Sequence, residues 1–189
     1  MKKSALLPGF IPLIAYGAFA AISGVTIALA AATVAAMVIG WTDLRKGMIL
    51  SWANLVLFGS MLVAIGILDM TWIIPYMGIL IYAALASVTF GSILLKKAFT
   101  LPYARGMVDK ALWDNPLFIR VNVFMTGVWG GIFSINAGLS AITLIAPGLA
   151  GHIFQVLTYI ALVSGIIFTM WYPGHIRKKY APGPVQDTR

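Results

Sequence analysis

The sequence predicts an all-α protein, a polytopic bundle of transmembrane helices, and three observations predict it. Of the 189 residues, 61% are hydrophobic and 10% are charged, whereas soluble domains carry roughly a quarter charged residues. The apolar residues occur in blocks of about 20 or more, the length that spans a hydrocarbon core. The stretch 48–68 does not alternate polar and apolar residues as a membrane β-strand would. We therefore expect one transmembrane domain over residues 1–172.

The first charge-free block, residues 5–41, is too long for one span. A single helix of 37 residues would reach about 55 Å, well beyond a hydrocarbon core of roughly 30 Å. Ser23-Gly24 is the best breaker, so we expect a short first segment over 6–21 and a second over 25–41. The first segment contains prolines and is barely long enough to cross, so it either crosses or lies re-entrant or tilted at the interface.

Four further spans follow, for six segments in all. Polar turns bound them, and we expect these spans over 48–68, 72–95, 121–145 and 153–172. The polar, basic and proline-rich residues 173–189 predict a tail without fixed structure. Placing both termini in the cytoplasm puts all 13 Lys and Arg residues on the cytoplasmic side, as the positive-inside bias requires.

The long loop 96–120 predicts a cytoplasmic interfacial amphipathic helix over residues 103–112. Apolar residues in this stretch repeat at i, i+1, i+4, i+5, i+8 and i+9, which is one face of a helix. Arg105 and Asp109 form an i, i+4 pair on the other face. Such a helix would lie flat at the membrane surface, with Trp113 anchoring its end.

The end of this loop predicts the start of the next span. Asn115 suits the N-cap position and Pro116 suits the first helical position. Basic and aromatic side chains of the loop are candidates for contact with the interface or with lipid headgroups. They are Lys96, Lys97, Arg105, Lys110, Trp113 and Arg120.

The span 121–145 holds the candidate polar site. An amide at Asn136, deep in the bilayer, needs hydrogen-bond partners. It either lines a cavity for a small ligand or lipid, or it bonds a neighbouring helix at roughly 1 kcal/mol per contact. The candidate cavity residues are Asn122, Thr126, Trp129 and Asn136. A stripe of small residues predicts close helix packing beside them, namely Gly127, Gly131, Ser134 and Gly138.

The titratable residues argue against several function classes. Cysteine is absent and there are only two histidines, His152 and His175, so we expect no disulfide, metal, cofactor or catalytic residue. The middle thirds of the spans hold no Asp, Glu, Lys or His, which argues against proton relays and ion-coupled carriers. No basic stripe with interleaved aromatic residues stands outside the spans, so we expect no nucleic-acid partner.

Several segments carry a resemblance to a known family. Leu6-Leu7-Pro8 followed by 11–19 and an Ala/Thr-rich second helix resembles the opening of the intracellular septation protein A family. Residues 99–105 and a later set also look like relatives of that kind: Trp113, Pro116, Phe118, Asn122, Thr126 and Trp129. In this likeness Trp129 and Asn136 match the aromatic residue and the Asn of a late span. The resemblance implies a multi-pass protein of the bacterial inner membrane with a role in envelope organisation or septation.

These observations lead to one function and two alternatives. We expect a non-enzymatic inner-membrane protein that organises the envelope or acts as a scaffold. Its partners would be membrane lipids and other membrane proteins or a second copy of itself. The first alternative is a small transporter, or the substrate-binding membrane subunit of one. The second is an accessory subunit of a larger membrane complex.

Overall fold

Every regular element in the described part of the chain is a helix, which confirms the all-α prediction. The computed structural model describes residues 7–146 and 148–179. Two shorter apolar helices come first, followed by helices whose length and composition suit a membrane-embedded protein. Four helices are long and apolar enough to cross, over Ile49–Gly66, Thr71–Leu94, Pro116–Ile145 and Gly151–Arg177.

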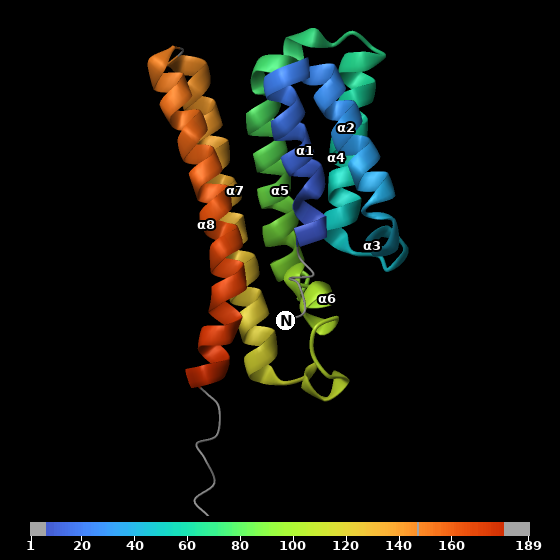
Figure 1. Ribbon diagram of the computed structural model, residues 1–189, viewed down its shortest axis with the longest axis vertical. Coiled ribbons are helices and arrows are strands. Elements are labelled where there is room, and N and C mark those ends of the chain that lie inside the picture. The colour runs from blue at the N-terminus through green and yellow to red at the C-terminus, as the bar shows by residue number, and fades with distance from the viewer. Residues whose placement is uncertain (1–6, 147, 180–189) are drawn as a thin grey trace, which may run out of the picture.

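The first charge-free block folds back at the predicted position. Helix α1 (Leu7–Ser23) and helix α2 (Val25–Val38) are separated by Gly24, whose φ of 83° lies in the left-handed region that favours glycine. The two helices pack as a hairpin (Figure 1). Their 17 and 14 residues rise about 25 and 21 Å, less than a core of roughly 30 Å. Six full crossings therefore stay a prediction.

The third and fourth predicted spans are present and are joined by a short turn. Helix α3 (Trp41–Arg45) precedes helix α4 (Ile49–Gly66). A 3-10 segment, η1 (Thr71–Tyr76), then leads into helix α5 (Met77–Leu94). Asp69, with a φ of 54°, reverses the chain between α4 and η1.

The loop after α5 contains two short helical pieces. Helix α6 (Thr100–Arg105) and the 3-10 turn η2 (Lys110–Leu112) replace the continuous helix predicted over 103–112, which was wrong. The break has a local cause. Asp109 is extended, and its carboxylate accepts the backbone N–H of Ala111 at 3.0 Å, so it caps η2 instead of continuing α6.

Helix α7 (Pro116–Ile145) begins as the Asn-Pro pair predicts. The Asn115 side-chain oxygen accepts the backbone N–H groups of Leu117 at 2.8 Å and Phe118 at 3.3 Å, which satisfies two donors that a helix start leaves free. At 30 residues, α7 rises about 45 Å. It therefore extends past the hydrocarbon core.

Helix α8 (Leu149–Lys179) is longer than the span predicted for it. The tail was expected to begin at residue 173, but residues 173–179 continue the helix through Pro173, so this boundary was wrong. The rings of Trp171 and His175 stack with centroids 4.7 Å apart, which ties the turn after the proline to the turn before it. Residues 180–189 of the predicted tail lie outside the described residues.

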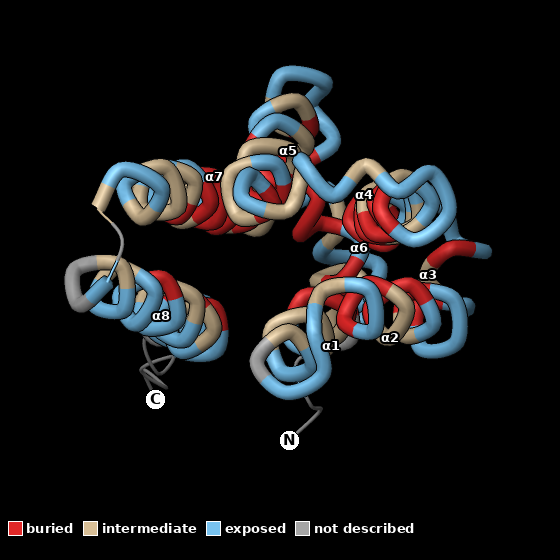
Figure 2. Tube along the Cα trace, turned by 90° about the horizontal axis from the view of Figure 1, so that it is seen from above, coloured by how far each residue is buried: buried red, intermediate tan, exposed pale blue. Residues whose placement is uncertain are grey.

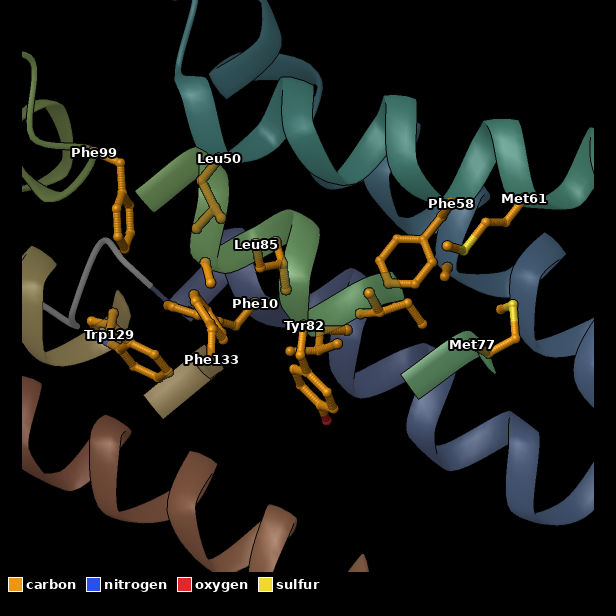
Figure 3. Close-up of a cluster of buried hydrophobic side chains, with 14 of the residues drawn as sticks. Phe10, Leu50, Phe58, Met61, Met77, Tyr82, Leu85, Phe99, Trp129 and Phe133 are labelled. Atoms are coloured by element: carbon orange, nitrogen blue, oxygen red, sulfur yellow. The ribbon is translucent and has the colours of Figure 1, made fainter. Parts of the chain in front are cut away.

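The helices form two groups. Helices α1, α2, α4 and α5 pack together, and α7 with α8 forms a hairpin that joins this group through the contact of α7 with α5 (Figures 1 and 2). One cluster of buried side chains extends from Phe58, inside the first group, to Phe133 on α7, and both rings are fully buried (Figure 3). Helix α8 packs along α7, whereas it lies across from α1 without close packing along its length (Figure 2).

The segments that carry the described Lys and Arg residues lie at one end of the bundle. This basic end consists of α3, the connection from α5 to the start of α7, and the last turns of α8 (Figure 1). The turns at the opposite end, around Gly24, Asp69 and Gly148, carry no Lys or Arg among the described residues. The side of the membrane that each end faces stays a prediction.

Candidate functional site

An elongated cleft of about 830 Å³ lies between α1 and α8. Residues of η1, α5 and α7 close its inner side. The lining runs from Trp129 to Thr143 on α7 and from Gly151 to Ile166 on α8, so the cleft follows the helices for roughly 20 Å. It therefore covers about two-thirds of a hydrocarbon core.

The chemistry of the lining changes along the cleft. The end away from the basic loops has polar side chains, including Thr143, His152 and Gln155. The end toward the basic loops is apolar and includes Phe10, Trp129 and Ile166. The cleft is therefore amphipathic along its long axis.

An aromatic stack forms the apolar end. The rings of Phe10 and Trp129 lie 4.2 Å apart, and Phe133 packs against Trp129 at 5.5 Å (Figure 3). The indole Nε1 of Trp129 donates to the Thr169 hydroxyl of α8 at 2.9 Å. Because its one polar group is satisfied and its ring is stacked, Trp129 is a rigid wall between α1, α7 and α8.

Three tyrosines from three helices line the middle of the cleft. They are Tyr16 of α1, Tyr82 of α5 and Tyr159 of α8. Tyr82 turns its hydroxyl out of the buried cluster (Figure 3). Within the described part of the chain, Tyr103 alone among the tyrosines has a hydroxyl that forms a hydrogen bond. The three cleft hydroxyls are therefore available to a molecule in the cleft.

Of the four predicted cavity residues, Trp129 lines the cleft and Asn136 lies next to it. Asn136 is fully buried between α7 and α8. Its Nδ2 donates to the Thr158 carbonyl at 3.4 Å, and its Oδ1 has no partner among the described residues. Asn136 therefore makes a contact between helices, which is the second of the two alternatives that the sequence left open.

The other two predicted cavity residues attach α6 to α7. The Thr100 hydroxyl is 2.9 Å from both the Asn122 carbonyl and the Thr126 hydroxyl. The Asn122 side chain bonds within its own helix, donating from Nδ2 to the Phe118 carbonyl at 2.8 Å. These groups satisfy one another outside the cleft, and they hold the loop against the bundle.

The predicted small-residue stripe does not mark the close contacts within this chain. A Cβ added at Gly131 or Gly138 would meet nothing within 4 Å. Close approach occurs at other glycines: an added Cβ would lie 2.7 Å from Phe90 at Gly130 and 2.6 Å from Ile132 at Gly165. Close helix packing along the stripe stays a prediction.

The predicted interfacial residues lie at the basic end. Lys96, Lys97, Lys110 and Arg120 are exposed there. Arg105 and Trp113 contact each other: the indole Nε1 donates to the Arg105 carbonyl at 3.2 Å, and the guanidinium lies 5.3 Å from the ring centroid. Their contact with lipid headgroups stays a prediction.

Tyr103 anchors this loop beneath the cleft. Its hydroxyl lies 3.2 Å from the Ser51 hydroxyl of α4. Burial raises the pKa of Tyr103 to about 12, the hydrogen bond with Ser51 lowers it, and the charge of Asp43 raises it. Tyr103 is therefore neutral at physiological pH. An added Cβ at Gly9 would lie 3.0 Å from this hydroxyl, so α6 packs tightly under the start of α1.

The three tyrosines and Phe10 were not predicted as site residues. Phe10 and Tyr16 stand on α1, Tyr82 on α5 and Tyr159 on α8, so no spacing within one helix connects the three tyrosines. One signal was present in the sequence: tyrosine favours the ends of membrane spans, yet Tyr16, Tyr82 and Tyr159 stand inside theirs. Mid-span tyrosines need hydrogen-bond partners, which is a reason to look for a shared site.

Comparison with protein-family models, curated proteins and solved structures finds no match to this chain. The resemblance to the intracellular septation protein A family therefore stays a prediction. Among the described residues, no group of three His, Cys, Asp or Glu side chains is placed to hold a metal ion.

Proposed function

We propose that this protein is a membrane-embedded binding protein that holds an apolar or amphipathic molecule between α1 and α8. It would act as a small transporter or as the substrate-binding membrane subunit of one. The cleft itself carries this proposal, because its volume of about 830 Å³ falls within the range of about 300–1,000 Å³ that ligand sites occupy.

An empty cleft of this size is unfavourable, so it favours an occupant. Protein interiors are packed about as densely as organic crystals, and unfilled volume loses dispersion contacts along its whole lining. The apolar end of the cleft offers the Phe10 and Trp129 rings, which gain most from contact with another apolar group. A hydrocarbon chain from the bilayer supplies that contact.

The packing of α8 supports a lateral way in. Among the described helices, α8 packs along α7, and it does not pack closely along α1. A molecule dissolved in the bilayer would therefore enter sideways between α1 and α8 without crossing the polar ends. A role through partner proteins stays a prediction beside this proposal. The protein would then organise the envelope or act as an accessory subunit of a larger membrane complex.

Substitution of Gly17 tests the proposal. Gly17 lines the cleft, and an added Cβ there would lie 3.8 Å from the Tyr159 ring, an ordinary contact. The Cβ of Gly17→Leu therefore fits, and the rest of the leucine side chain would take up volume in the cleft beside Tyr159. We expect native mass spectrometry of the full-length wild-type protein, released from its membrane, to show a retained molecule. We expect Gly17→Leu to lose most of that occupancy.

Gly131→Leu is the matched control. It is the same substitution in a helix, at a position outside the cleft lining where an added Cβ meets nothing within 4 Å. It should retain the molecule as the wild type does. Equal occupancy in wild type and Gly17→Leu, or no retained molecule on the wild type, would contradict the proposal.

A further inference from the structure

We infer that the cleft selects a long apolar chain joined to a carbonyl group, which the hydroxyls of Tyr16, Tyr82 and Tyr159 bind as hydrogen-bond donors. This inference rests on the proposed binding function and names the chemistry of its ligand. Two membrane components share that chemistry: the acyl esters of lipids and prenylated quinones.

The three side chains converge from different directions on one stretch of the cleft. Tyr16 comes from α1, Tyr82 from α5 and Tyr159 from α8, and all three line the cleft. The Tyr159 ring of α8 reaches α1 beside Tyr16, because an added Cβ at the neighbouring Gly17 would lie 3.8 Å from it. A molecule lying along the cleft would pass all three side chains.

The hydroxyls have hydrogen-bonding capacity to spare. In the described part of the chain they form no hydrogen bond with protein groups. The Tyr82 side chain is nine-tenths buried, whereas Tyr159 is 44% exposed. A polar group held in an apolar setting without a partner is unfavourable, and inside a bilayer water does not relieve it. A ligand that accepts these hydrogen bonds gains their energy without displacing any protein partner.

The rest of the lining points to a neutral acceptor. None of the described residues that line the cleft is Asp, Glu, Lys or Arg, and the one histidine, His152, stands at the polar end. The stretch with the tyrosines therefore offers no countercharge to a phosphate or ammonium group. A carbonyl oxygen is neutral and accepts from a phenol hydroxyl. A chain attached to it would run toward the apolar end, onto the ring of Trp129.

A single-tryptophan protein makes this measurable. The full chain has six tryptophans, of which Trp129 lines the cleft. Replacing the others by Phe makes fluorescence report on the cleft. We would titrate three quenching probes in detergent: a decyl-substituted benzoquinone, a phospholipid with dibrominated acyl chains, and dibromodecane. Dibromodecane is an apolar chain without a carbonyl.

Tyr82→Phe removes one donor and keeps the ring. Because one hydrogen bond contributes about five-fold in affinity, we expect the half-quenching concentration of a carbonyl probe to rise about five-fold. The triple variant with Tyr16→Phe and Tyr159→Phe should raise it further. Dibromodecane should quench all variants equally, which also shows that the cleft remains folded. Tyr76→Phe, at an exposed tyrosine outside the lining, is the matched control and should change nothing.

The outcomes distinguish a failure of the hydroxyls to bind the carbonyl from a failure of the cleft to bind any molecule. If the tyrosine substitutions raise the half-quenching concentration of the quinone alone, or of the phospholipid alone, that probe identifies the source of the carbonyl. If carbonyl probes quench Trp129 equally in the wild type and the triple variant, the role of the hydroxyls is overturned while binding in the cleft stands. If no probe quenches Trp129, dibromodecane included, the binding function fails with it.

Discussion

At the scale of single residues, two of the buried asparagines, Asn54 and Asn136, have different surroundings. Asn54 of α4 donates from Nδ2 to the Gly9 carbonyl at 2.7 Å, beside the stretch of α1 that contains Pro12. Asn136 makes only a 3.4 Å contact with the Thr158 carbonyl. Each has an Oδ1 without a partner among the described residues. The difference in donor geometry decides what each amide contributes.

Replacing each asparagine by leucine, a side chain of similar size, should separate them. Asn136→Leu removes a buried unpaired oxygen and a weak contact, so the free energy of unfolding should stay unchanged or rise by up to about 1 kcal/mol. Asn54→Leu removes a short hydrogen bond and should lower it by about 1–2 kcal/mol. Reversible unfolding in mixed micelles measures both. A loss above about 2 kcal/mol in Asn136→Leu would mean that its oxygen has a partner.

At the scale of elements, the contact between α7 and α8 depends on Gly165. An added Cβ there would lie 2.6 Å from the end of Ile132, which is flexible, and 3.1 Å from the ring of Trp129. The ring is fixed by its stack on Phe10 and its bond to Thr169. Because the ring cannot yield, any larger residue at 165 pushes α8 away from α7.

Gly165→Ala should therefore lower the free energy of unfolding by about 1–3 kcal/mol, the usual effect of overpacking. Gly131→Ala, in the same helix pair but with open space around it, should be neutral or slightly stabilising, because alanine favours helix more than glycine does. The same unfolding assay compares the two. Equal stability of both variants would show that α8 is not seated on Trp129 as described.

The elements were predictable to the extent that local chemistry sets them. Gly24 ends α1 because it alone readily adopts the left-handed region there, and Asn115-Pro116 starts α7 by capping it. The prediction of one helix over 103–112 was wrong because apolar periodicity does not reveal that Asp109 caps a new turn. The cleft was not predictable, because its walls come from helices far apart in sequence.

At the scale of the whole molecule, the native chain lacks cysteine, so single introduced cysteines report its threading. Lys46→Cys and Lys110→Cys stand at the basic end; Ser23→Cys, Asp69→Cys and His152→Cys stand at the other. We expect impermeant thiol reagents to label the first two from the cytoplasmic side and the last three from outside. Labelling of Ser23→Cys from the cytoplasmic side would show that α1 and α2 do not cross.

The most direct test of the binding function is an experimental density map of the wild-type protein in nanodiscs made with lipids from its own membrane. We predict elongated density between α1 and α8, extending from the ring of Trp129 past the hydroxyl of Tyr82. Gly17→Leu, mapped in the same lipids, should lack it. Closure of α8 onto α1, or an unoccupied cleft in the wild type, would contradict the account.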